Sequence, residues 1–278
     1  MQDKKIKVLY IAGFERSGST LVNRVLGQLD GFVAWGELRD IWEHGFAENR
    51  ACTCGASFYD CIAWQQVFQY WADSERAMTM VRLKERARAA TLLEPLGQPG
   101  ERLLRAVSKP YLAELEQFYQ ALKATTHSRV IVDSTKASWY GYVLSLLPSI
   151  DLYTVHIVRD PRGVCYSLQK RKTQGEPECQ WYNPVHAALS WNLKNLAVEK
   201  FLKSPSKKYL RVRYEDFIDS PETAIKSLTS LLQEPVSELP LVGPAAVKMT
   251  VDHIITGSPS SRSNTGAVKL RRDETWKQ

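Results

Sequence analysis

Short apolar runs rich in β-branched residues recur along the chain, and most are followed by a stretch whose apolar positions repeat every three or four residues. The first pattern is typical of buried strands and the second of helices with one apolar face. The strands predicted in this way are 6–13, 32–35, 129–133, 152–158 and 208–213. Helices are predicted at 18–29, from the third strand to Leu147, from Pro161, at about 185–202 and at 221–233. A mostly helical stretch covers about 37–124, and Pro95, Gly97, Pro99 and Gly100 mark a loop within it.

The alternation of strands and helices predicts an α/β fold with a central, mostly parallel sheet covered on both faces. The 278 residues, 44% hydrophobic and 24% charged, are sufficient for one large domain over 1–278. The residues after Met1 lack a secretory signal pattern, and no apolar run approaches the roughly 20 residues of a membrane span. A cytoplasmic protein without a membrane partner is therefore expected.

The turn after the first predicted strand is a glycine-rich loop, Gly13-Phe14-Glu15-Arg16-Ser17-Gly18-Ser19-Thr20, that leads directly into a helix. Glycines and the N–H groups of a helix start wrap a phosphate in this arrangement. Nucleoside triphosphatases require a lysine where this chain has Ser19, so ATP or GTP hydrolysis is not expected. Positive charge comes instead from Arg16. We predict a 5′-phosphate site in a P-loop-like three-layer fold with a helical insertion; a turn that uses its glycines only to change direction is the alternative.

A second anion site is predicted after the strand at 152–158. Arg159 lies at the carboxyl end of that strand, where open α/β sheets bind ligands. In the helix that follows, Ser167 and Arg171 lie four residues apart and share one face. Two arginines and a hydroxyl are suited to clamping a phosphate. A solvated basic helix start is the alternative.

Two phosphate sites, one lacking the P-loop lysine, fit a nucleotide with phosphates at its 5′ and 3′ ends. At these motifs the chain resembles the sulfotransferases that use 3′-phosphoadenosine 5′-phosphosulfate (PAPS). Their 5′-phosphosulfate loop, (Lys/Arg)-Ser-Gly-(Thr/Ser)-Thr, matches Arg16-Ser17-Gly18-Ser19-Thr20. Their 3′-phosphate motif, an arginine that ends a strand and a serine eight residues later, matches Arg159 and Ser167.

Two later segments extend the resemblance to about residues 5–276. Tyr214 begins a Tyr-Glu-Asp-Phe run similar to an element beside the nucleotide in that family. His253-x-x-x-Gly-Ser-Pro, with Arg262 and Trp276, is similar to the closing segment of many bacterial members, although Ser replaces the usual Asn. The resemblance implies PAPS as co-substrate, no metal, and a nucleotide site made by Arg16, Ser17, Gly18, Ser19, Thr20, Arg159, Ser167, Arg171, Tyr214 and Arg262.

Glu37 is the candidate general base, because the turn after the second strand of a P-loop-like fold faces the first loop. Gly36-Glu37-Leu38-Arg39 closely resembles the Gly-Glu-x-Arg of tyrosylprotein sulfotransferases, whose glutamate is the base. The resemblance implies that Glu37 takes the proton of the acceptor and that Arg39 orients the acceptor or Glu37. A carboxylate that only stabilises a helix start is the alternative.

Lys136 is the candidate for stabilising the leaving phosphate. The animal small-molecule sulfotransferases have a histidine after the third strand, but this chain has Asp133-Ser134-Thr135-Lys136. Lys136 could supply positive charge there, and a solvated lysine at a helix start is the alternative. The absence of a histidine assigns the base role to Glu37.

These motifs predict in-line transfer of a sulfuryl group from PAPS to a hydroxyl or nitrogen of a small molecule, with Glu37, Arg16 and Lys136 as catalytic residues. The acceptor is expected to lie against the helical regions 37–128 and 172–203, with Trp35, Arg39 and His253 as candidate contacts. A nucleotide kinase with a degenerate P-loop, and a non-catalytic nucleotide- or polyanion-binding module, are the alternatives.

The predicted class of acceptor follows from a further resemblance. The N-terminal segment is similar to that of cyanobacterial sulfotransferases of secondary metabolism, among them those that N-sulfate the carbamoyl group of saxitoxin-type alkaloids.

The net charge of +7 suits a polyanionic nucleotide and also a nucleic-acid binder. The basic residues are spread along the chain, which favours a defined ligand over nucleic acid.

Three of the five cysteines, Cys52, Cys54 and Cys61, lie close together in the sequence. A disulfide framework is not expected in a chain of this size and compartment. A zinc site requires four ligands, and only His44 lies nearby in the sequence. Structural packing or an isolated disulfide is therefore favoured over zinc, and no metal is predicted.

Overall fold

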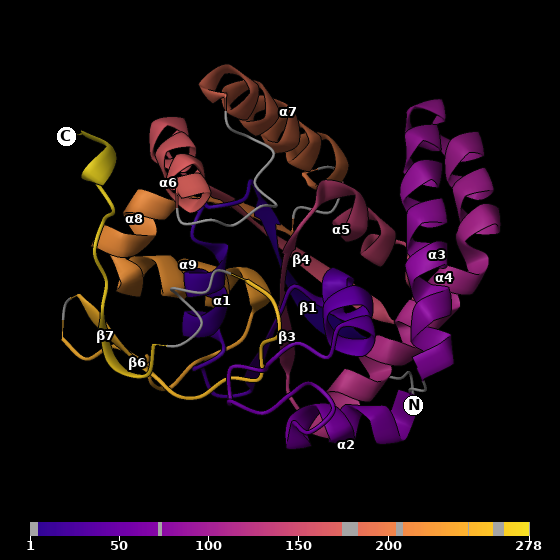
Figure 1. Cartoon of the computed structure of the whole chain (residues 1–278), viewed down its shortest axis with the longest axis horizontal. Helices are drawn as coiled ribbons and strands as arrows, with labels where there is room; N and C mark the ends of the chain where they lie inside the picture. Colours follow the sequence, from indigo (N-terminus) through magenta and orange to yellow (C-terminus); the bar gives the residue numbers. More distant parts are fainter. Residues whose placement is uncertain are drawn as a thin grey trace.

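A five-stranded sheet forms the centre of the fold (Figure 1). The structure, a computed structural model, describes residues 5–71, 74–173, 183–203, 208–243, 245–257 and 264–277. All pairs of neighbouring strands in this sheet are parallel, in the order β2-β3-β1-β4-β5. The strands are β1 (Ile6–Gly13), β2 (Phe32–Gly36), β3 (Val130–Lys136), β4 (Ile150–Val158) and β5 (Tyr209–Arg213). The predicted α/β class and all five predicted strands are confirmed.

Alternation along the central strand divides the core between the two faces of the sheet. Val8 and Tyr10 of β1 contribute to one apolar cluster, whereas Leu9 and Ile11 contribute to the other. This follows from the strand period of two, and it requires helices on both sides. One face is covered by α1 (Ser19–Leu26), α8 (Tyr214–Asp219) and α9 (Pro221–Leu232). The opposite face is covered by the insertion helices together with α5 (Ser138–Ser145) and α7 (Pro184–Leu202).

The predicted helical stretch between β2 and β3 is interrupted more than the sequence pattern indicated. It contains the 3₁₀ turn η1 (Leu38–Asp40), the π-helical η2 (Trp42–Ala47), α2 (Ile62–Trp71), α3 (Ser74–Ala90), the 3₁₀ turn η3 (Thr91–Leu96) and α4 (Gln98–Thr126). A non-helical connection that contains the three clustered cysteines separates η2 from α2. The predicted loop at 95–100 is also shorter: Gly97, at φ 66°, caps α4. Pro99 lies in the first turn of that helix, where a missing N–H is tolerated.

After β4 the chain adds α6 (Pro161–Thr173) and, nearer the C-terminus, a small hairpin, β6 (Ala246–Met249) with β7 (Gly266–Lys269), before the 3₁₀ turn η4 (Thr275–Lys277). The hairpin was not predicted, because its two strands are four residues each and lie far apart in the sequence. Residues 174–182, part of the predicted acceptor region, lie outside the described residues. No helix in the described ranges combines the length and apolarity that crossing a membrane requires.

Candidate functional site

The loop between β1 and α1 has the backbone shape that an anion site requires. Arg16 and Gly18 have φ values of 64° and 87°, so the chain curls around its own N–H groups before the helix begins. Gly18 is required there, since a Cβ would lie 2.4 Å from the ring of Tyr214. Ser17 is buried, and its Oγ has no hydrogen-bond partner among the described residues. A buried, unsatisfied hydroxyl in such a loop fits an anionic ligand.

The second predicted anion site lies directly against this loop. Arg16 Nε donates a hydrogen bond of 2.9 Å to Oγ of Ser167, which is on α6. Arg159 donates to the carbonyl of Arg16 at 3.0 Å, and its guanidinium lies 4.9 Å from the ring centroid of Tyr214. The structure therefore brings four of the predicted nucleotide residues into one cationic cluster. Arg159 also pairs with Asp273 at 3.2 Å. The side chain of Arg171 and all of Arg262 lie outside the described residues.

Glu37 and Lys136, which were singled out separately in the sequence, form an ion pair through Glu37 Oε1 and Lys136 Nζ. Lys136 ends β3 at φ 71°. In the strand register it lies opposite Ala12, the residue of β1 that immediately precedes the loop from Gly13 to Thr20. Both side chains are largely covered, so Lys136 is not a solvated helix-start lysine. The backbone N–H of Glu37 is fixed by Oγ1 of Thr256 at 3.0 Å. An acid–base group and a cation thus lie beside the loop.

Arg39 does not contact Glu37 through its guanidinium. Its Nε and a terminal nitrogen donate to the two carboxylate oxygens of Asp40, at 2.6 and 2.7 Å. This bidentate pair fixes the direction of the arginine side chain. The predicted role of Arg39 in orienting Glu37 therefore has no direct contact to support it, whereas a role toward the acceptor stays a prediction.

Asp133 is a residue of this region that the sequence reading missed. Its fully buried carboxylate accepts hydrogen bonds from Oγ1 of Thr135 at 2.6 Å and from the hydroxyl of Tyr119 at 2.6 Å. It also receives a longer contact, 3.5 Å, from the N–H of Leu38, and Oγ1 of Thr135 accepts from the N–H of Arg39. Asp133 therefore supports the turn that carries Glu37. Burial raises the pKa of Asp133 to about 6.

Asp133 should make the stability of the fold depend on pH. With a pKa of about 6 in the folded protein and 3.8 as its ordinary value, the folded state binds this proton more tightly. Its contribution is therefore complete below pH 3.8 and is lost as pH rises through about 6, a decrease of about 3 kcal/mol in the free energy of unfolding. Urea unfolding of wild type and Asp133→Asn between these pH values measures the difference. Parallel pH profiles for the two proteins would contradict the assignment.

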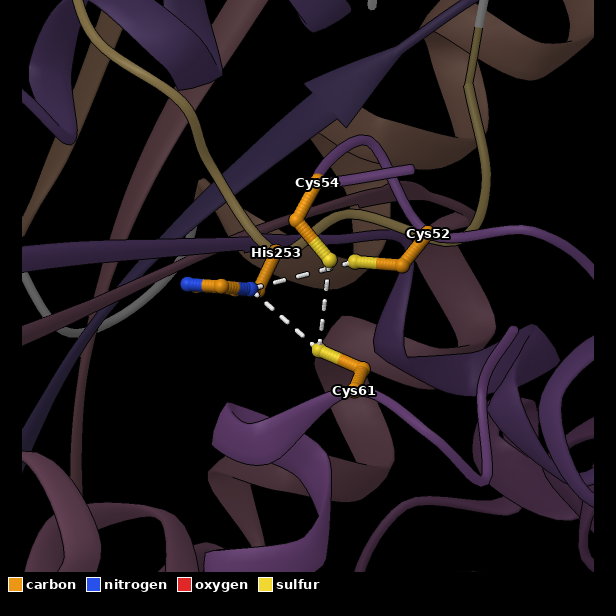
Figure 2. Close-up of side chains that lie close together, drawn as sticks. All are labelled: Cys52, Cys54, Cys61 and His253. Atoms are coloured by element: carbon orange, nitrogen blue, oxygen red, sulfur yellow. Dashed lines mark hydrogen bonds between the residues drawn. The ribbon is translucent and has the colours of Figure 1, made fainter. Parts of the chain in front are cut away.

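Two predicted acceptor contacts, Trp35 and His253, have other partners in the structure. Trp35 is 3% exposed and packs on Trp64, with ring centroids 4.4 Å apart. Trp42 is also fully buried. His253 turns its Nδ1 toward the cysteines of the connection before α2 (Figure 2). A contact of Trp35 or His253 with the acceptor therefore stays a prediction.

Comparisons with known proteins agree with the fold. The profile of a family described as the sulfotransferase family matches residues 9–238. No curated protein matched the chain. A solved sulfotransferase domain from the curacin biosynthetic pathway is 20% identical, with 96% of this chain and 85% of that chain covered and a TM-score of 0.51, which shows a shared fold. The sulfotransferase domain of the Synechococcus PCC 7002 olefin synthase is 19% identical, with coverages of 84% and 76% and a TM-score of 0.47. A sulfotransferase of Mycobacterium tuberculosis H37Rv is 16% identical, with coverages of 85% and 70% and a TM-score of 0.47.

Proposed function

The chain belongs to the sulfotransferase family and is a PAPS-dependent enzyme of that family, and from this premise we propose that it transfers a sulfuryl group to a hydroxyl or nitrogen of a small molecule. The observation that supports this most is the contact of Arg16 with Ser167, at 2.9 Å. It joins the phosphate loop and the predicted 3′-phosphate motif into one cluster. The Glu37–Lys136 pair lies beside the same loop. We treat residues 1–278 as a single catalytic domain.

We assign the 5′-phosphosulfate of PAPS to the loop from Arg16 to Thr20. The unsatisfied hydroxyl of Ser17 and the N–H groups at the start of α1 are the donors that fit such a group. Arg159 and Ser167 are assigned to the 3′-phosphate, and Arg171 and Arg262 remain predicted partners. Tyr214 contributes by packing, because its ring lies against both Gly18 and Arg159.

The residues beside the loop are suited to sulfuryl transfer to an acceptor group that must lose a proton as it attacks. PAPS supplies a sulfuryl group attached to a phosphate that leaves as an anion. Glu37 accepts the proton of the acceptor, and Lys136 holds the carboxylate in place while presenting a positive charge at the loop. Arg16 and the loop N–H groups add to that charge, in the role that Mg²⁺ has in many phosphoryl transfers.

We propose a secondary metabolite as acceptor and a carbamoyl nitrogen of a saxitoxin-type alkaloid as the first to test, on the N-terminal resemblance. Incubation of the protein with sulfur-labelled PAPS and pools of hydroxyl, amine and carbamoyl compounds tests this. Label that appears in a carbamoyl compound supports the proposal, and label in another pool corrects the acceptor. A protein that transfers phosphate from ATP and leaves PAPS intact is a kinase. Tight binding of 3′-phosphoadenosine 5′-phosphate (PAP) without any transfer identifies a binding module.

Arg159 provides the matching test of the co-substrate. Arg159→Ala should weaken the binding of 3′-phosphoadenosine 5′-phosphate by about 1.5–3 kcal/mol, roughly 10–150-fold, because a charge-assisted hydrogen bond to a phosphate is lost. ADP has no 3′-phosphate, so its weaker binding should not change. Calorimetry with both nucleotides measures the difference. Arg162→Ala, which removes an exposed arginine three residues away, is the control and should leave both affinities unchanged. Equal wild-type affinity for the two nucleotides would contradict the assignment.

A further inference from the structure

Three cysteines and a histidine outside the proposed transfer site direct their side chains at one point (Figure 2). Nδ1 of His253 lies 3.2 Å from Sγ of Cys61 and 3.9 Å from Sγ of Cys52. Sγ of Cys54 lies 3.7 Å from Sγ of Cys61. All four atoms lie within 4.8 Å of one another. The cluster therefore has the composition Cys₃His.

These separations are those of ligands around one tetrahedral ion. With Zn–S bonds of about 2.3 Å and Zn–N bonds of about 2.0–2.1 Å, tetrahedral ligand atoms lie about 3.5–3.8 Å apart. The 3.2, 3.7 and 3.9 Å contacts bracket this range. A disulfide would require sulfurs about 2.0 Å apart, and all three cysteines are free thiols. Packing alone does not require the polar edge of an imidazole to face three sulfurs.

Local structure fixes the three cysteines before any ion binds. Gly55, at φ 93°, allows a tight turn in which its N–H donates to the carbonyl of Cys52 at 2.9 Å. The N–H of Cys52 in turn donates to the carbonyl of Ala56 at 2.8 Å. Cys52 and Cys54 therefore share one turn. Cys61 immediately precedes α2.

Hydrogen bonds to the backbone of residues 252–254 hold His253 in place. Oγ1 of Thr53 donates to the carbonyl of Asp252 at 2.6 Å and accepts from the N–H of Ile254 at 2.9 Å. Nε1 of Trp64 donates to the carbonyl of His253 at 3.1 Å. The fourth ligand is thus held in place by bonds on both sides of it. His44, the nearest histidine in the sequence, instead contacts Glu48 at 3.1 Å.

We propose that Cys52, Cys54, Cys61 and His253 bind a structural Zn²⁺ ion. Thiolate sulfur and imidazole nitrogen are the ligands that zinc prefers, and four protein ligands leave no position for substrate. This replaces the expectation of packing or a disulfide, which considered only residues near the cysteines in sequence. The ion connects the loop before α2 to the segment 252–257.

That segment reaches the proposed transfer site, so the ion has a consequence that rests on the proposed function. Oγ1 of Thr256 accepts from the N–H of Glu37 at 3.0 Å. A Cβ added to Gly257 would lie 3.1 Å from Oγ1 of Thr20, so the backbone there packs on the phosphate loop. Loss of zinc should therefore loosen the turn of Glu37 and lower kcat more than it weakens PAP binding.

The zinc content of the freshly purified full chain, prepared under reducing conditions, tests the site directly. We expect about one equivalent of zinc for wild type and less than about one tenth for Cys61→Ser, because three ligands hold the ion far less tightly than four. Cys165→Ser, which removes a free cysteine outside the cluster, is the matched control and should keep its zinc. Exchange of wild type with Co²⁺ should produce thiolate-to-cobalt absorption and the visible bands of a tetrahedral site.

Other outcomes decide the proposal as clearly. His253→Cys should keep zinc and His253→Ala should lose it, which separates ligation from a merely structural need for the histidine. If Cys61→Ser fails to fold, cobalt exchange of wild type still decides. The zinc site would be overturned if purified wild type contains no zinc and, when zinc is added, neither binds it nor unfolds at a higher temperature. Stoichiometric iron in the purified protein would show that the four residues bind iron and not zinc. A zinc-bound protein that transfers no sulfuryl group would leave the site intact and remove the proposed function.

Discussion

Glu37→Gln is expected to reduce turnover roughly 10²–10⁴-fold, the usual contribution of a general base. Glutamine keeps the shape of the side chain and can still accept a hydrogen bond from Lys136, but it does not take a proton at neutral pH. The binding of 3′-phosphoadenosine 5′-phosphate should stay nearly unchanged, because Glu37 is assigned to the acceptor. Steady-state rates with PAPS and an identified acceptor, together with calorimetry, measure both quantities.

The pH profile makes this test sharper. Wild type should lose activity on the acidic side as the base is protonated, and Glu37→Gln should lack that limb. Glu48→Gln, which changes an exposed carboxylate elsewhere in the insertion between β2 and β3, is the control and should be as active as wild type. Near-normal turnover of Glu37→Gln would place the base elsewhere. Loss of nucleotide binding would show that the turn supports the loop and is not catalytic.

Lys136→Met should lower kcat by roughly 10²–10³-fold, the cost of removing one group that stabilises charge in the transition state. Methionine has a similar length and no charge. Lys208→Met is the control, because Lys208 also forms an ion pair, with Asp151, but at the amino ends of β4 and β5, away from the loop. Rapid-quench measurement of a single turnover reports the chemical step.

The double variant distinguishes a working pair from two independent residues. Because Glu37 and Lys136 contact each other, the loss in Glu37→Gln/Lys136→Met should be smaller than the product of the two single losses. Fully multiplicative losses would show that the two side chains act separately. An active Lys136→Met enzyme would remove the lysine from the catalytic assignment.

Local patterns in the sequence were sufficient to predict the sheet and the tight glycine-containing turn between β1 and α1. The apolar run of β1, the loop from Gly13 to Thr20 and the helix after it form a contiguous stretch whose physics is local. Glu37 and Lys136 could also be selected from the sequence, because Glu37 follows β2, Lys136 ends β3, and the carboxyl ends of parallel strands meet at one edge of a sheet. Their ion pair is a consequence of that topology.

The remaining features depend on contacts between distant residues. His253 lies 192 positions from Cys61, so only the fold reveals it as the fourth member of the cysteine cluster. Trp35 precedes the turn of Glu37 in the sequence and was therefore a candidate acceptor contact, but in the structure it packs in the core against Trp64. Asp133 lies in the middle of β3, directly after the apolar run Val130-Ile131-Val132, and its role became visible only once the fold brought the turn of Glu37 beside it.

The segment 252–257 also determines when the site can form during folding. Asp252 forms a buried ion pair with Arg24 of α1, from 228 positions away, and Thr256 contacts the turn of Glu37 across 219 positions. Contacts of such sequence separation close the longest loops and form slowly. The phosphate loop and β2 leave the ribosome early, but the support of Glu37 arrives only when most of the chain has been made. All five strands of the sheet are therefore made before the segment that supports the turn of Glu37.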